Sequence, residues 1–143
     1  IGAEELLFPE GYPTYQSSWL KFAPDTVYWG VRMFSESLGR DDLNIVVTES
    51  GASQPDEIDA DGEVMDTGRV MYLRETLKSA HRAIEEGYPL DGFFVWSFMD
   101  NFEWANGYVE RFGITYVDFD TQQRTPKESY DWFEQVVAQN RVL

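Results

Sequence analysis

The chain has 143 residues, which is enough for one ordinary domain with a single hydrophobic core. Its 26 acidic residues outnumber its 11 basic residues, and the formal charge of −15 argues against binding to nucleic acids or to anionic membranes. Because the sequence contains no cysteine, it excludes disulfides, thiol catalysis and cysteine-ligated metal centres.

The first part of the chain is predicted to be a loop followed by a helix and a strand. Residues 1–23 are rich in turn-forming residues and are expected to lead into the helix. Apolar side chains at helical spacing predict a helix over residues 24–38, and Gly39 ends the pattern. Residues 43–48 are expected to form a strand covered on both faces, because apolar side chains occupy consecutive positions.

A long acidic loop over residues 50–65 separates this strand from a second helix. Apolar side chains at helical spacing mark that helix over residues 70–84, and Gly87 ends it. Residues 92–98 are apolar throughout and are predicted to be a second buried strand. The order of strand, helix and strand is that of a βα unit with parallel strands.

The last third of the sequence predicts a loop, one more short strand and a closing helix. The loop covers residues 99–108 and the strand residues 114–119. Thr125-Pro126-Lys127-Glu128 has the pattern of a capping box with proline at the first helical position, so the last helix is expected to begin there. Buried strands that alternate with amphipathic helices imply a parallel α/β sheet, in which reactive groups gather at the carboxyl ends of the strands.

Glu49 closes the first predicted strand and is a candidate nucleophile or general acid–base. Burying a carboxylate without partners costs free energy, so a partly exposed strand end without a chemical role is the alternative interpretation. Ser50 and Gly51 follow Glu49 and would let the chain turn away sharply, which would keep the carboxylate open.

Trp96, Glu103 and Trp104 lie within or just after the second predicted strand. An aromatic face is a flat apolar platform and a carboxylate accepts directional hydrogen bonds from hydroxyl groups, so this combination suits a neutral, hydroxyl-rich ligand such as a sugar. A large aromatic core is the alternative explanation, for Trp96 in particular. Because the carboxyl ends of parallel strands lie at one edge of the sheet, we expect these three residues to line the same pocket opening as Glu49.

Two other features are not expected to carry chemistry. The run from Glu57 to Gly62 is similar to the front half of a calcium loop, but its twelfth position is Gly68 instead of Glu, so we interpret it as a solvated loop and expect no metal. His81 is the only histidine and falls in the middle of the second predicted helix, so a Ser–His–Asp triad is not expected.

Three segments resemble the β-glucosidases and their relatives in glycoside hydrolase family 1. V-V-T-E-S-G at residues 46–51 is similar to the nucleophile motif of the family, although Ser50 stands where Asn is common. F-V-W-S-F-M-D-N-F-E-W-A-N-G-Y-V-E-R-F-G-I-T-Y-V-D at residues 94–118 resembles the last barrel strand and its sugar-binding loop, and R-T-P-K-E-S at residues 124–129 resembles the start of the closing helix.

The resemblance covers the chain from about Pro13 onward. The fold that it implies is α/β, namely the C-terminal part of a (β/α)8 TIM barrel with about the last two βα units and a preceding helix. Residues 1–143 would then be one C-terminal segment of a single catalytic domain.

Carried over by position, the resemblance implies that Glu49 is the catalytic nucleophile. Trp96 would form one wall of the glycone subsite, and Phe112 would line its far side. Glu103 would accept hydrogen bonds from sugar hydroxyls, and Trp104 would contact the same sugar. Family members that act on phosphorylated sugars typically carry Ser at position 103, with Lys and Tyr at positions 110 and 112, so the resemblance implies an unphosphorylated sugar.

The implied activity is the retaining hydrolysis of β-glycosidic bonds, in which two carboxylic acids stand about 5 Å apart. The family carries the second acid in a Thr-(Phe/Leu)-Asn-Glu-Pro segment, and this sequence has no such run. A whole barrel takes about 250 residues. We therefore expect the chain to need the complementary N-terminal part of the barrel, with a small β-glycoside as substrate and no cofactor.

The rival hypothesis is a non-catalytic fragment that binds carbohydrate or another partner through its aromatic surface. Such a module would use Trp96 and Trp104 but would have no use for a carboxylate at a strand end. A flavodoxin-like domain is disfavoured because no glycine-rich phosphate loop follows a strand. The chain begins with Ile1, which indicates processing or a longer polypeptide. With no bilayer-spanning run and no leader visible, we expect a cytoplasmic location and no membrane partner.

Overall fold

The structure is a computed structural model that describes residues 7–40 and 42–143. Its elements are α1 (Thr26–Leu38), β1 (Ile45–Ser50), α2 (Thr67–Glu85), β2 (Leu90–Val95), η1 (Trp104–Asn106), β3 (Thr115–Val117), β4 (Arg124–Pro126) and α3 (Glu128–Gln139). Of the loop predicted at residues 1–23, residues 1–6 lie outside the described residues, and residues 7–23 contain one isolated bridge between Thr14 and Lys21. None of the described helices combines the length and hydropathy needed to cross a bilayer.

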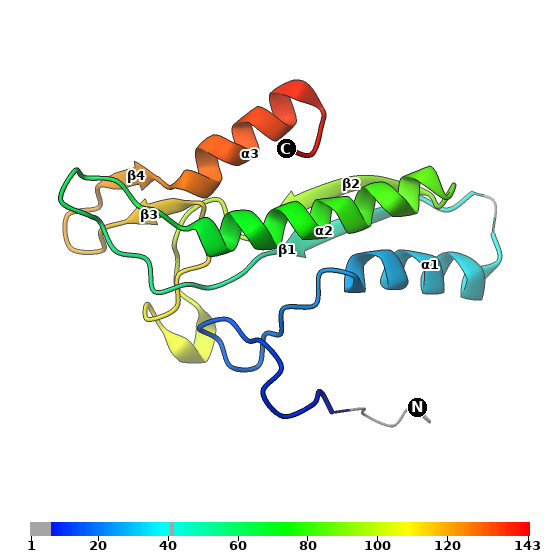
Figure 1. The fold of residues 1–143 in the computed structure, drawn as a ribbon, viewed down its shortest axis with the longest axis horizontal. Coiled ribbons are helices and arrows are strands. Elements are labelled where there is room, and N and C mark those ends of the chain that lie inside the picture. Colours follow the sequence, from blue (N-terminus) through cyan, green and yellow to red (C-terminus); the bar gives the residue numbers. More distant parts are fainter. Residues whose placement is uncertain (1–6, 41) are drawn as a thin grey trace.

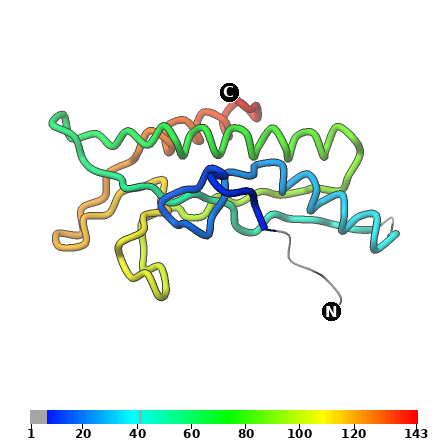
Figure 2. Tube along the Cα trace, turned by 60° about the horizontal axis from the view of Figure 1, so that its bottom comes forward, coloured from blue at the N-terminus to red at the C-terminus, as the bar shows by residue number. Residues whose placement is uncertain are grey.

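The strands β1 and β2 pair in parallel, and α2 is the crossover between them, which confirms the predicted βα arrangement. Figure 1 shows α2 between α1 and α3, running alongside the strand pair. Figure 2, turned by 60° from that view, shows the same order of helices. The loops beyond the carboxyl ends of β1 and β2 gather with the β3–β4 hairpin at one end of the molecule (Figure 1).

The hydrophobic core lies between one face of the strand pair and the helices α1 and α2. Tyr28 and Val31 of α1, Ala80 and Ala83 of α2, and Leu90 of β2 are all buried in it. Each helix contributes one apolar stripe, as expected of an amphipathic helix that covers a sheet. This core fixes the helices along the strands and leaves the carboxyl ends of the strands to the loops.

The opposite face of the strand pair is open. Val46 of β1 is 42% exposed and Phe94 of β2 is 61% exposed. The prediction that the first strand is covered on both faces is therefore wrong for the described residues, whose helices cover one face only. Consecutive apolar residues are typical of a strand with cover on each side, so this second apolar face has no cover from the described part of the chain.

Most of the predicted elements are confirmed, with shifted bounds. α1 begins at Thr26 and ends before Gly39, whose left-handed φ of 55° suits glycine. β1 extends to Ser50, so Glu49 lies inside the strand near its end. β2 ends at Val95, and Trp96 therefore follows the strand instead of lying inside it.

The predicted start of the last helix at Thr125 is wrong. Residues 124–126 form β4, which pairs antiparallel with β3, and α3 begins at Glu128. Lys127 stands at the N-cap position, but its side chain makes no capping hydrogen bond and is buried. The pairing of β4 with β3 outweighs the local capping signal, because the context of a strand overrides local propensity.

Candidate active site

The carboxyl ends of β1 and β2 lie side by side, so the backbone at Glu49 and Ser50 runs next to the backbone at Val95 and Trp96. Ser50 pairs with Val95 in the strand register, and the Trp96 amide donates to the Ser50 carbonyl at 2.9 Å. A Cβ atom on Gly51 would clash with the Trp96 carbonyl oxygen and would lie 2.7 Å from its carbonyl carbon. Glycine at position 51 is therefore what allows the two strand ends to approach so closely.

Glu49 lies in an irregular step of β1. Val47 pairs with Phe93 and Ser50 pairs with Val95, so β1 advances three residues while β2 advances two. Such a β-bulge bends a strand and re-aims a side chain, and bulges are common next to active sites. The Glu49 side chain is exposed, and among the described residues it has neither a hydrogen bond nor an ion pair. Its carboxylate is thus free to meet a ligand.

The segment that follows β2 is held by its own polar contacts. The Trp96–Ser97 peptide bond is cis. The buried Ser97 amide donates to the Phe112 carbonyl at 3.1 Å, and its Oγ donates to the Met99 carbonyl at 2.8 Å. Asn101 Nδ2 in turn donates to Ser97 Oγ at 2.9 Å. The start of this loop, next to Trp96, is therefore tied to its return near Phe112, which is 5% exposed.

Glu103 and Trp104 lie at the tip of the same loop. The Glu103 amide donates to the Gly107 carbonyl at 2.7 Å, and the Glu103 carbonyl accepts from the Asn106 amide at 2.8 Å. Trp104 has a left-handed φ of 42° and is 81% exposed. The structure thus joins Glu49, Trp96 and Phe112 through backbone contacts of their segments, while Glu103 and Trp104 extend from the loop between them. That all of them face one sugar stays a prediction.

A buried ionic network, which the sequence did not predict, lies behind these loops. Its members are three cations and three carboxylates: Arg69, Arg111, Lys127, Asp56, Asp66 and Asp100. Arg69 and Lys127 side chains are fully buried, and that of Asp100 is as well. Burial lowers the pKa of Lys127, and the charge of Arg69 lowers it further, while Asp100 and Asp56 oppose this shift. The only signal of this ionic network in the sequence is the spacing of three residues between Asp66 and Arg69, which suits an ion pair at a helix start.

The loop before α1 packs against the same end of the molecule. Ser17 Oγ shares a hydrogen bond of 2.6 Å with Ser53 Oγ and also donates to the Glu110 carboxylate. Gln16 Nε2 donates to the Val109 carbonyl at 3.4 Å. The carboxylate of Glu110 is therefore engaged by a hydroxyl group of the chain itself.

Ser50, the residue after Glu49, is hydrogen-bonded to a tyrosine of α2. The Ser50 and Tyr72 hydroxyls are 2.9 Å apart. Tyr15 packs edge-on against Tyr72 at 5.4 Å between ring centroids, and burial raises the pKa of Tyr15, with the charge of Tyr72 adding to the rise. This contact anchors the end of β1 to α2.

Neither His81 nor the acidic run from Glu57 to Gly62 is expected from the sequence to carry chemistry. His81 is exposed on α2 and faces Glu85 at 3.5 Å. Across residues 7–40 and 42–143, no three His, Cys, Asp or Glu side chains are grouped as a metal site.

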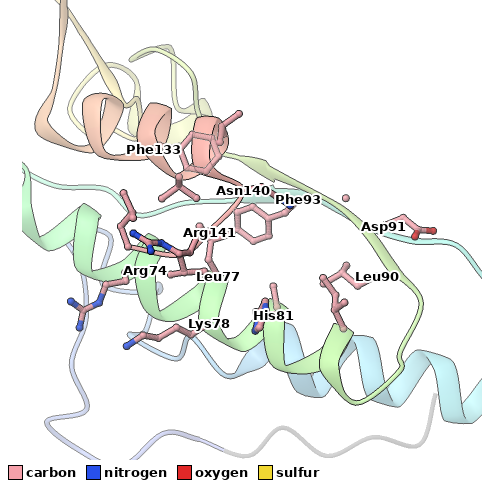
Figure 3. Close-up of a pocket in the computed structure, with 17 residues that line it drawn as sticks. Arg74, Leu77, Lys78, His81, Leu90, Asp91, Phe93, Phe133, Asn140 and Arg141 are labelled. Carbon is pink, nitrogen blue, oxygen red and sulfur yellow. The ribbon is translucent and has the colours of Figure 1, made fainter.

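A pocket of about 830 Å³ lies between α2, the first half of β2 and the end of α3. Figure 3 shows His81 and Leu77 of α2 on one side of it, with Phe93 of β2 and Phe133 of α3 across from them. It is lined by the amino-terminal half of β2, so it is separate from the loops at the carboxyl ends of the strands.

Comparison with known proteins assigns this arrangement to a family. The model of glycosyl hydrolase family 1 matches residues 7–142. β-Glucosidase A from Thermotoga maritima is 43% identical over 120 residues, covering 84% of this chain and 26% of that protein. A bifunctional β-D-glucosidase/β-D-fucosidase from Bifidobacterium breve is 42% identical over 134 residues, covering 91% of this chain and 28% of that protein.

The solved structures agree with the sequence comparison. The family 1 β-glucosidase from Thermotoga maritima in complex with isofagomine lactam superimposes with a TM-score of 0.90 at 39% identity, covering 95% of this chain and 30% of that one. The chain thus spans about a quarter to a third of the length of the relatives that it matches. On its sequence and its fold, which is that of the C-terminal part of an α/β barrel, the chain belongs to glycosyl hydrolase family 1.

Proposed function

We propose that this chain supplies the nucleophile and part of the glycone site of an enzyme that hydrolyses β-glycosidic bonds with retention. The observation that carries the proposal is the carboxylate of Glu49, which has no partner among the described residues and is exposed at a bulge where β1 ends beside Trp96. A carboxylate at the carboxyl end of a parallel strand has the position of a catalytic group in an α/β barrel. The names of the relatives, β-glucosidases among them, support the same reaction.

In the proposed reaction, Glu49 attacks the anomeric carbon of the sugar. A bond forms between its carboxylate and that carbon while the bond from the carbon to the leaving oxygen breaks. A carboxylic acid from the upstream part of the barrel protonates the leaving oxygen and then takes a proton from water, which displaces Glu49 and restores both groups. The two inversions at the anomeric carbon retain its configuration.

The loop after β2 would hold the sugar during this reaction. In the proposal Glu103 accepts hydrogen bonds from sugar hydroxyls, and the rings of Trp96 and Trp104 contact the apolar faces of the sugar. Phe112 lines the far side of the same pocket. The high exposure of Trp104 leaves its indole available to a ligand.

The preferred substrate would be an unphosphorylated β-glucoside or a related sugar. Glu103 and Glu110 place two carboxylates on the loop that would meet a phosphate, and like charges repel in a partly desolvated site. Glu110 already receives a hydrogen bond from Ser17 and has no cation among its partners in the described residues. The net charge of −15 adds to this preference at long range.

The partner in this proposal is the N-terminal part of the barrel, with residues 1–143 forming one segment of a single catalytic domain. The open apolar face of β1 and β2, with Val46 and Phe94 exposed, supports it. Apolar strand faces and unpaired strand edges are costly in water and are normally covered.

The test joins this chain to the upstream part of β-glucosidase A from Thermotoga maritima; we call the product the completed barrel. It is incubated with a 2-deoxy-2-fluoro-β-glucoside that carries a good leaving group, since the fluorine lets the glycosyl–enzyme accumulate. We expect one label per molecule on the peptide that contains Glu49. Glu49→Gln should abolish the label, and Glu57→Gln, which changes another exposed carboxylate, should retain it. A folded completed barrel that is unlabelled, or labelled elsewhere, would overturn the proposal.

The rival function is carbohydrate binding without catalysis, and the same sample decides between the two. Its supporting observation is the exposed aromatic set on the loop after β2, in which Phe102, Trp104 and Tyr108 are all more than half exposed. Binding of a β-glucoside that survives Glu49→Gln, together with an unlabelled parent protein, would favour this second function.

A further inference from the structure

The fully buried guanidinium of Arg69 connects the two loops on which the proposed site depends. Nε donates to the Ala52 carbonyl at 3.0 Å, in the loop after β1. Nη2 donates to the Arg111 carbonyl at 2.8 Å, in the return of the loop after β2. Ala52 is three residues beyond Glu49, and Arg111 is next to Phe112. One side chain of α2 therefore binds the backbone of both loops.

Carboxylates hold this guanidinium in place. Asp66, three residues before Arg69 on the same helix end, accepts from Nη1, and Asp56 accepts from Nη2 at 2.8 Å. Asp66 is itself fixed by the Ser129 amide at 2.8 Å. Because a planar guanidinium directs its donors in a fixed fork, these partners fix its orientation and balance its charge.

A second buried cation, Lys127, also links the loop after β1 to the loop after β2. Its Nζ lies 2.5 Å from Asp56, in the loop after β1, and 2.8 Å from Asp100, in the loop after β2. Asp100 also accepts from the Gly113 amide at 3.0 Å and from Arg111 Nη1 at 2.6 Å. Asp100 thus ties the first residues of the loop after β2 to its last ones.

The energetics of this network suit a role in fixing the relative positions of the two loops more than a role in stabilising the fold. Three cations face three carboxylates, so the charges balance, yet all of them except the partly exposed Arg111 lose their hydration on burial. Well-packed apolar side chains of similar volume commonly stabilise a protein as well as a buried ion pair does. What apolar side chains lack is direction, and the network supplies it at the place where two loops must keep a fixed spacing.

We propose that Arg69 is a positioning residue, which sets the spacing between Glu49 at the end of β1 and the sugar-binding tip of the loop after β2. The inference rests on the proposed function. Displacing a reacting group by about 1 Å can slow an enzyme by about 100-fold. Arg69→Lys keeps the charge but cannot reach Ala52, Asp66 and Arg111 together, so it should loosen this spacing.

The experiment titrates active sites in the completed barrel with the fluoro-glucoside and measures the labelling rate per competent site. For Arg69→Lys we expect about 10- to 100-fold slower labelling of each site. Asp56→Asn, which weakens the bridge between Arg69 and Lys127, should slow it in the same direction and decides the question if Arg69→Lys does not fold. Arg74→Lys changes an exposed arginine of the same helix and should leave the rate unchanged.

The number of competent active sites per molecule, which the titration also gives, distinguishes a positioning role of Arg69 from a purely structural one. If Arg69 only stabilises the fold, its variants would have fewer competent sites, each labelled at the parental rate, and this result would overturn the proposal. A second readout works without catalysis: ¹⁹F spectra of the fluorotryptophan-labelled protein should show shifted Trp96 and Trp104 resonances in Arg69→Lys, with Trp29 unchanged. An unlabelled parent protein would refute the proposed function, and unchanged Trp96 and Trp104 resonances would refute the positioning role.

Discussion

The two ends of the β1–β2 pair are held by different forces. Near the start of β2, the contacts are apolar, and Tyr28, Val31 and Leu90 pack between strands and helices. Beyond the carboxyl ends, the contacts are ionic, and Arg69 and Lys127 join the loop after β1 to the loop after β2. Apolar burial is strong but without direction, whereas paired charges and hydrogen bonds are directional. Apolar burial therefore supplies stability at one end, whereas at the other end the ionic contacts fix the relative positions of the loops, although breaking them would still leave buried charges unpaired.

The largest effect is expected for Gly51→Ala, because the new Cβ would lie 2.7 Å from the Trp96 carbonyl carbon and would force the strand ends apart. We expect the completed barrel to lose more than about 4 kcal/mol of its free energy of unfolding. Labelling at Glu49 should be lost as well. Urea unfolding and active-site titration measure the two losses.

The matched control is Gly30→Ala in α1, where a Cβ would meet no atom within 4 Å. Alanine is preferred over glycine in a helix by about 1 kcal/mol, so this variant should be neutral or more stable. A Gly51→Ala protein with parental stability would refute the close approach of β1 and β2 at this point.

Lys127→Met is expected to cost about 3–5 kcal/mol of the free energy of unfolding, because it leaves Asp56 and Asp100 buried without their shared cation. Lys78→Met removes an exposed lysine that pairs with Glu75, and should cost less than about 1 kcal/mol. Urea unfolding of both variants in the completed barrel checks the difference. Equal small losses would show that Lys127 is not the buried link that the structure describes.

Leu90→Ala tests the apolar end. Leu90 is 7% exposed in the core, so truncation should cost about 2–3 kcal/mol through lost burial and an unfilled cavity. Leu38→Ala, at a position that is 56% exposed, should cost much less. The labelling rate per competent site should stay parental in Leu90→Ala. A slower rate would contradict the separation of stability from geometry.

The smallest effect concerns Asp118 in the β3–β4 turn. The amides of Thr121 and Asp120 donate to its carboxylate at 3.0 and 2.9 Å and hold its pKa below the ordinary value of 3.8. Its contribution to stability is therefore present above pH 3.8 and is lost as the pH falls through the lowered pKa. Carboxyl NMR titration should give a midpoint below 3.8, and a midpoint at or above it would contradict these hydrogen bonds.

The sequence predicted the parts of this molecule that local patterns encode. Helical periodicity located α1 and α2, and Gly39 marked the end of α1. The order of elements predicted parallel strands with Glu49 near one carboxyl end. These features depend on residues close in sequence, so the pattern of neighbours is enough to find them.

The rest of the fold depends on contacts between distant segments. The bulge at Glu49 arises from the register with β2, and β4 forms because Thr125 can pair with Tyr116 instead of opening a helix. Lys127 reads as an ordinary surface residue, and only the approach of Asp56 and Asp100 makes it a buried cation. No local signal distinguishes such a lysine from an exposed one.

A crystal structure of the completed barrel trapped with the fluoro-sugar tests most directly whether Glu49 is the nucleophile. We expect a covalent bond from the anomeric carbon to the Glu49 carboxylate, with Trp96 against the sugar ring and Glu103 hydrogen-bonded to the sugar hydroxyls. A sugar bound covalently to another residue, or a Glu49 carboxylate that points away from the cavity that Trp96 and Glu103 share, would contradict it.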